Sequence, residues 1–194
     1  MDYESRLSLS RIQIREISKF ARKMLKIKTV KFPVLKALER LIDKFPMNLY
    51  YHILPDNEFE TNVMAELVPE GNDVYCIKIR ESVYEKAVND DRASLGFICH
   101  EMCHFILILI FEAGPTLYKG ENGLVYAGSF KDKELPLYKS MEWQAMALCG
   151  EVMIPYEKCK NYSFNQIVNR THSSDEQTKY FLRWVAKQEQ QKSS

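Results

Sequence analysis

One stretch limits the folds open to this chain more than any other. It is the apolar run from Phe97 to Phe111, which is interrupted by His100, Glu101 and His104. The run is shorter than the ~20 residues that a membrane span needs, so we interpret it as a buried helix. Burying three ionisable groups on an apolar helix costs free energy unless something compensates them. The fold must therefore supply that compensation.

The spacing of these three residues predicts a metal site. His100 and His104 are four positions apart, so on a helix they project from one face and can share a zinc ion at roughly 2.0–2.1 Å each. Glu101 is badly placed to be a further ligand, but it can hold a water molecule and take its proton. The alternative is a helix that carries two histidines by chance, which the apolar context disfavours. We expect His100 and His104 to be metal ligands and Glu101 to be catalytic.

A third ligand is expected from elsewhere, because catalytic zinc sites use three protein ligands and keep one position open. One Zn²⁺ per chain would satisfy this set. Helical carboxylates are held more rigidly than loop carboxylates, which favours Glu142 or Glu151. The acidic candidates downstream of the histidines are Glu112, Glu121, Asp132, Glu134, Glu142 and Glu151.

Residues 142–155 carry a second signature, EWQAMALCGEVMIP. Together with the His-Glu-x-x-His helix, it resembles the paired signatures of the ImmA/IrrE family of metallopeptidases, which are gluzincin-like. Cys103 stands where the family usually has Gly, and Gly96 stands where it commonly has Phe. These departures remove neither a ligand nor the base.

The resemblance implies that Glu142 is the third zinc ligand and that Glu151 lies outside the site. It implies a zincin-like endopeptidase of the bacterial cytoplasm that hydrolyses a peptide bond in a helix-turn-helix transcriptional repressor, often to control mobile elements. The alternative is a metal-binding interaction module that does not cleave, one partner of a toxin–antitoxin-like or mobile-element regulatory pair. Glu101 favours the peptidase, since a purely structural zinc has no use for a base.

Charge and cysteine content narrow the environment and the partners. The net charge is +1, but residues 1–45 hold twelve Lys/Arg against five Asp/Glu, and residues 56–91 hold three against ten. The acidic segment should attract basic, DNA-binding polypeptides, and the basic segment is either a solvated face or a docking surface. Five cysteines without a secretory signal favour reduced thiols in the cytosol. We expect neither direct nucleic-acid binding nor a membrane, and the oligomeric state is left open.

Several other residues are weaker candidates. Cys99 and Cys103 flank the histidines, but they point about 100° away from them, so small buried residues are favoured over zinc ligands. His172, Tyr118, Tyr126 and Tyr138 could donate to an oxyanion, although ordinary surface positions are the preferred interpretation. His52 is expected to be structural.

Periodicity predicts an α+β fold with a small, mostly antiparallel sheet and flanking helices. The resemblance implies that this fold is zincin-like, with the sheet packed against the active-site helix. Residues 1–45 form an N-terminal helical segment, 46–156 the metallopeptidase core, and 157–194 a C-terminal helical segment with a polar tail. Residues 114–139 form a long irregular loop that would wall or cover the cleft. Ser173 and Glu176 fit a capping box for the last helix. The expected helices span 10–26, 33–46, 92–111, 140–154 and 174–188, and the expected strands 49–54, 61–68 and 74–79.

Overall fold

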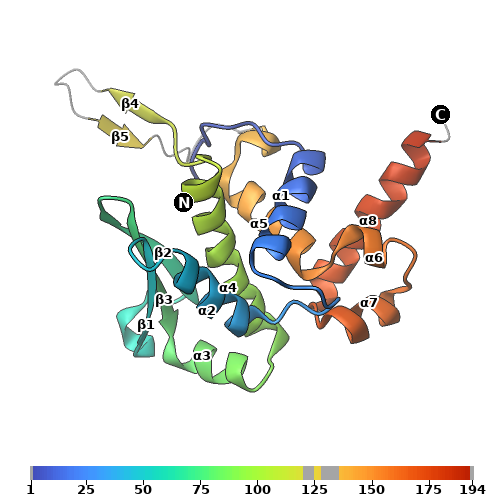
Figure 1. Ribbon diagram of the computed structural model, residues 1–194, viewed down its shortest axis with the longest axis horizontal. Coiled ribbons are helices and arrows are strands. Elements are labelled where there is room, and N and C mark those ends of the chain that lie inside the picture. Colours follow the sequence, from blue (N-terminus) through green and yellow to red (C-terminus); the bar gives the residue numbers. More distant parts are fainter. Residues whose placement is uncertain (1, 120–124, 128–135, 193–194) are drawn as a thin grey trace.

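The computed structural model describes residues 2–119, 125–127 and 136–192 of the chain, and it has the expected α+β composition (Figure 1). Eight α-helices and two small sheets are present in that part. The helices are α1 (Arg11–Met24), α2 (Val34–Lys44), α3 (Glu81–Val88), α4 (Arg92–Phe105), α5 (Met141–Met153), α6 (Tyr156–Cys159), α7 (Phe164–Thr171) and α8 (Asp175–Lys192). The strands are β1 (Leu49–Leu54), β2 (Ala65–Gly71), β3 (Val74–Arg80), β4 (Leu117–Lys119) and β5 (Val125–Ala127).

The main sheet is mixed, so the expectation of a mostly antiparallel sheet was wrong. Its strand order is β1-β3-β2, with β1 parallel to β3 and β2 antiparallel to β3. Gly71, Asn72 and Asp73 all have positive φ and form the tight turn that pairs β2 with β3. The strands β1, β2 and β3 alternate in direction along the chain. Because β3 lies between the other two in the sheet, it is parallel to β1 and antiparallel to β2. Strand β2 is left at an edge of the sheet.

Helix α4 lies at the centre of the molecule and contacts β2, β3, α2, α3 and α5 (Figure 1). The side chain of Phe105 is fully buried and packs edge-on against the rings of Phe45 and Tyr75, at centroid distances of 5.6 and 5.8 Å. Ile98 on the same helix is also fully buried. This packing fixes the helix that carries the two histidines.

Asp91 is the N-cap of α4, and its side chain accepts a hydrogen bond from the backbone N–H of Ser94. It changes to a π-helical turn, η2 (Ile106–Ile110), one residue after Phe105, where the sequence predicted an uninterrupted α-helix. By length and composition the span Arg92–Ile110 could cross a membrane, with a mean hydropathy of 1.8 over its most apolar window. Sixty-one per cent of that window is buried inside the structure, as it is in many core helices of soluble proteins.

The N-terminal segment is bound to the part of the chain that follows α4. The backbone of Ser5 donates to Lys139 O at 2.8 Å, and the backbone of Arg6 donates to Gly114 O at 2.9 Å. Helix α1 then packs on α5. At the other end of the chain, the capping box of α8 uses Ser174 and Gln177, one position beyond the predicted pair.

The segment predicted as an irregular loop contains a short hairpin, in which β4 and β5 pair antiparallel. The 3-10 turn η3 (Leu137–Lys139) leads from this region into α5. Residues 120–124 and 128–135 lie outside the described residues, so the proposed covering role of the loop stays a prediction.

Candidate metal centre

Two imidazoles from α4 form the base of the site. His100 Nε2 and His104 Nε2 lie 3.1 Å apart, and their rings meet at 90°. Both residues belong to the same helical face, as the four-residue spacing predicted. The His104 side chain is 11% exposed and that of His100 is 23% exposed, so both are largely buried but still reach solvent.

The third group comes from the first turn of α5. Glu142 Oε2 lies 3.2 Å from His100 Nε2, and Glu142 Oε1 lies 3.4 Å from His104 Nε2. One ligand atom from each of the three residues can be chosen so that all lie within 4.8 Å of one another. Tetrahedral zinc with bonds of 2.0–2.1 Å separates its ligand atoms by about 3.3 Å. The separation of 3.1 Å between the two imidazole nitrogens and that of 3.2 Å between His100 Nε2 and Glu142 Oε2 are close to this value. The contact of 3.4 Å to His104 is made by the other carboxylate oxygen, Oε1. The three residues are therefore close enough to share one metal ion.

The electrostatics of the three groups favour a bound cation. Burial opposes ionisation of Glu142, but hydrogen bonds from His100 and His104 outweigh it and hold the pKa of that carboxyl well below its usual range. Burial also acts to lower the pKa of His100, and the hydrogen bond to Glu142 more than reverses this and raises it. Without a metal, the site thus holds a carboxylate whose negative charge the two imidazoles favour.

Glu101 faces the main sheet beside the histidines. Its Oε2 accepts a hydrogen bond from the backbone N–H of Leu67, at 2.8 Å, on the edge strand β2. Burial raises the pKa of Glu101, while the charges of His100 and His104 act in the opposite direction. The carboxylate is therefore held by one backbone donor, in surroundings that favour its accepting a proton.

Residues that the sequence did not single out hold Glu142 in place. Ser140 is the N-cap of α5: its Oγ accepts from Trp143 N at 2.9 Å and donates to Asp2 Oδ2 at 2.6 Å. Asp2 Oδ1 also accepts the backbone N–H of Glu142, at 3.2 Å. No local pattern reveals this contact, because the partners are about 140 positions apart in the chain.

Two of the other acidic candidates, Glu151 and Glu112, are described by the structure and lie outside the cluster. Glu151 is 1% exposed and pairs instead with Arg11 at 3.0 Å and Arg15 at 3.3 Å. Glu112 is exposed, with a positive φ, beyond the end of the π turn. Glu121, Asp132 and Glu134 lie outside the described residues. Glu142 is thus the carboxylate that the structure brings to the two histidines, as the resemblance implied.

The weaker candidates occupy other places. Cys99 and Cys103 are buried, as predicted, and burial raises the pKa of the Cys103 thiol. His172 Nε2 contacts the backbone oxygen of Asp90 at 2.7 Å, at the turn before α4, which fits an ordinary structural role. Tyr118 donates to Glu4, at 2.6 Å, and Tyr138 is half-exposed. The side chain of Tyr126 lies outside the described residues.

In comparisons with known proteins, no protein-family model, no curated protein and no solved structure matches the chain.

Proposed function

We propose that this chain is a zinc-dependent endopeptidase of the ImmA/IrrE type that cuts one specific protein, a small helix-turn-helix repressor. The observation that carries the proposal is the convergence of His100, His104 and Glu142, whose ligand atoms lie within 4.8 Å of one another and can share one metal ion. Glu101 beside them supplies the base that hydrolysis needs. A purely structural zinc site would have no use for that residue.

Zinc held by His100, His104 and Glu142 would supply the Lewis acid that polarises the scissile carbonyl. Glu101 acts as the general base, taking a proton from the attacking water and passing it to the nitrogen of the leaving amine. Its Oε2 is engaged by Leu67 N–H, so Oε1 is the oxygen assigned to the proton. The raised pKa of Glu101 suits a group that must take a proton and return it near neutral pH.

The substrate would bind as an extended strand along β2, since this strand is an edge of the sheet and touches Glu101 through Leu67. Strand β2 lies within the acidic segment 56–91, in which the carboxylates of Glu60, Glu70 and Asp73 are exposed. Such a surface favours a basic, DNA-binding polypeptide at short range. The resemblance to repressor-cleaving peptidases supports the same substrate class.

The test is to incubate the zinc-loaded protein with a purified helix-turn-helix repressor encoded nearby. We expect cleavage at one site, little digestion of casein or short random peptides, and slower cleavage at higher salt because the attraction is partly electrostatic. Glu101→Gln should keep its zinc and cut at least about 100-fold more slowly, since Gln cannot accept the proton. Glu176→Gln, a matched loss of one exposed carboxylate in the first turn of α8, should cut the repressor as wild type does.

The outcomes separate the peptidase from its alternative. A protein that binds zinc and the repressor but leaves it intact, with Glu101→Gln binding equally well, would be the non-cleaving interaction module. Rapid digestion of generic unfolded protein with the repressor left whole would reject the substrate while keeping the peptidase.

A further inference from the structure

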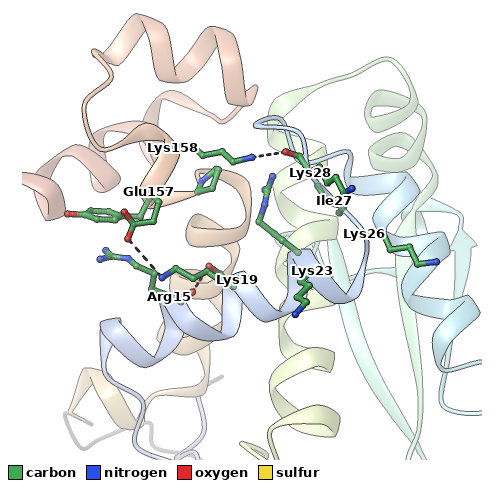
Figure 2. Close-up of a pocket in the computed structure, with 12 residues that line it drawn as sticks. Arg15, Lys19, Lys23, Lys26, Ile27, Lys28, Glu157 and Lys158 are labelled. Atoms are coloured by element: carbon green, nitrogen blue, oxygen red, sulfur yellow. Dashed lines mark hydrogen bonds and ion pairs between the residues drawn. The ribbon is translucent and has the colours of Figure 1, made fainter.

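A cavity of about 470 Å³ lies away from the metal centre, between α1 with the turn after it and the start of α6 (Figure 2). It is lined by twelve residues, of which seven are Lys or Arg and one is acidic, Glu157. The volume is in the range of pockets that hold small ligands, roughly 300–1,000 Å³. An excess of cations this large around a small cavity indicates an anionic ligand.

The lysines at the rim of the cavity differ in whether a carboxylate balances their charge. Lys19 pairs with Glu16 at 2.7 Å and reaches Glu157 at 4.0 Å. The ammonium groups of Lys23 and Lys28 are exposed, and within the described part of the chain they make neither an ion pair nor a hydrogen bond. Lys158 closes the far side, where its Nζ donates to the backbone oxygen of Lys28, at 2.6 Å (Figure 2).

Arg22 provides a buried positive charge in the wall of the same cavity. It is 7% exposed, and its guanidinium donates to the backbone oxygens of Val152 and Thr29. None of the described carboxylates pairs with it, although Arg15, about two turns earlier on α1, is paired with Glu151. A buried charge without an opposite charge costs free energy, and here burial lowers the pKa of Arg22. An anion in the cavity would offset that cost.

The rest of the wall is apolar. Ile27 is 8% exposed, and Pro155 and Tyr156 line the opposite side. The guanidinium of Arg15 covers the ring of Tyr156 at 3.5 Å from its centroid and holds it in position. A ligand that fits both parts of this wall carries clustered negative charge at one end and an apolar body at the other.

We propose that this cavity binds a small polyphosphate compound, with the phosphates at Lys19, Lys23 and Lys28 and the body against Ile27 and Tyr156. A nucleoside triphosphate and inorganic tripolyphosphate share the phosphate chemistry and differ in the body. The site is independent of the proposed peptidase chemistry, because Val152 and Glu142 are ten positions apart on α5, about 15 Å along the helix axis.

The experiment is calorimetric titration of the whole, metal-free chain with ATP, tripolyphosphate, adenosine and inorganic phosphate. We expect ATP and tripolyphosphate to bind, and ATP to raise the melting temperature, while adenosine binds at least about tenfold more weakly. ATP binding more tightly than tripolyphosphate would place the nucleoside on the apolar wall. Equal binding would assign the site to the phosphate chain alone, which keeps the polyphosphate proposal and rejects the contact with the body.

A pair of matched double variants tests the location. Lys23→Glu with Lys28→Glu should weaken ATP binding by more than about tenfold, because each reversal replaces an attraction with a repulsion at close range. Lys36→Glu with Lys86→Glu makes the same change of charge at exposed positions outside the cavity and should leave binding within about twofold. Equal effects of the two pairs, no ATP binding at about 1 mM, or a DNA duplex that binds and is not displaced by ATP would each overturn the proposal.

Discussion

Glu142 and Glu151 are both glutamates on α5, but they differ in exposure and in the charged groups that they contact. The Glu142 side chain is 45% exposed and contacts two imidazoles, whereas that of Glu151 is 1% exposed and contacts two guanidinium groups. Nine positions of an α-helix rotate by about 180°, so the two carboxylates point in opposite directions. One face of α5 thus contributes Glu142 to the candidate metal centre, and the other attaches the helix to α1.

The difference teaches that charge compensation, not residue type, separates a structural carboxylate from a functional one. Glu151 carries one negative charge beside Arg11 and Arg15, which are permanently positive, so it needs nothing further. Glu142 faces histidines that are positive only when protonated, so its charge is open to an added cation. Substitutions of the two should therefore affect different measurements.

The largest effect on folding is expected from Glu151→Ala. It leaves the buried Arg11 and Arg15 without their anion, which should lower the free energy of unfolding by about 3–5 kcal/mol. Urea denaturation of the metal-free protein measures this. Zinc affinity of the molecules that remain folded should be unchanged. A loss below about 1 kcal/mol would mean that Glu151 is no more important to folding than an exposed residue.

Glu142→Ala should show the reverse pattern. Zinc affinity should fall at least about 100-fold, because removing a ligand costs more than the 10–100-fold attributed to groups that only support ligands. Unfolding of the metal-free protein should change by less than about 1 kcal/mol, as for exposed ion pairs. Glu176→Ala, in the first turn of α8, is the matched control and should leave zinc binding intact. A Glu142→Ala protein that keeps its zinc affinity would remove this residue from the site.

A smaller effect is expected where the helix that carries Glu142 begins. Ser140→Ala removes the side-chain cap of α5 and should cost about 1 kcal/mol of folding stability. Because Ser140 also holds Asp2, zinc should bind several-fold more weakly. Ser163→Ala removes the corresponding cap of α7, so it should cost a similar amount without changing zinc affinity. Equal zinc affinity in the two variants would show that the cap does not position Glu142.

The smallest effect is expected on the pH dependence of folding stability in the metal-free protein, where His100 pairs with Glu142. The raised pKa of His100 contributes stability that is present below its ordinary value of 6.5 and is lost as the pH rises through the folded value. The lowered pKa of Glu142 contributes stability that is present above its ordinary 4.5 and is lost as the pH falls through the folded value. The excess stability of wild type over Glu142→Gln should therefore be greatest between these two ordinary values.

That excess should stay below about 1 kcal/mol, since solvent screens a half-exposed pair. Unfolding titrations of both proteins from acidic to alkaline pH would measure it. Zinc affinity should rise with pH across the same range, because His100 must lose its proton to bind. A stability difference that grows steadily toward alkaline pH would contradict the pairing.

Part of this site follows from local sequence and part does not. Helical spacing was enough to place His100 and His104 on one face, since that geometry depends only on the turn of the helix. Choosing Glu142 over Glu151 required the resemblance to a known signature, because both lie on one helix. A local signal did exist: Arg11 and Arg15 lie on the apolar stripe of α1 with Ile14, which indicates a buried anion as their partner.

Local sequence patterns predicted neither the strand order of the main sheet nor the hydrogen bonds that hold Glu101 and α5 in place. The strands at 49–54 and 74–79 were found nearly to the residue, but their order depends on how residues 55–64 cross to the far side of β3. The bond from Leu67 N–H to Glu101 and the bonds from Asp2 to α5 join parts of the chain that have no common pattern. They arise from tertiary packing alone.

The attachment of Asp2 to α5 has a consequence for the timing of synthesis. Asp2 is made before its partners Ser140 and Glu142, which follow 138 and 140 positions later. A ribosome adds roughly 5–20 residues each second, so the two halves of this contact are separated by many seconds. Residues 100–104 are already made during that interval, but the third carboxylate and its support are not. The nascent chain therefore cannot bring the three residues together until Glu142 has been synthesised, 38 positions after His104.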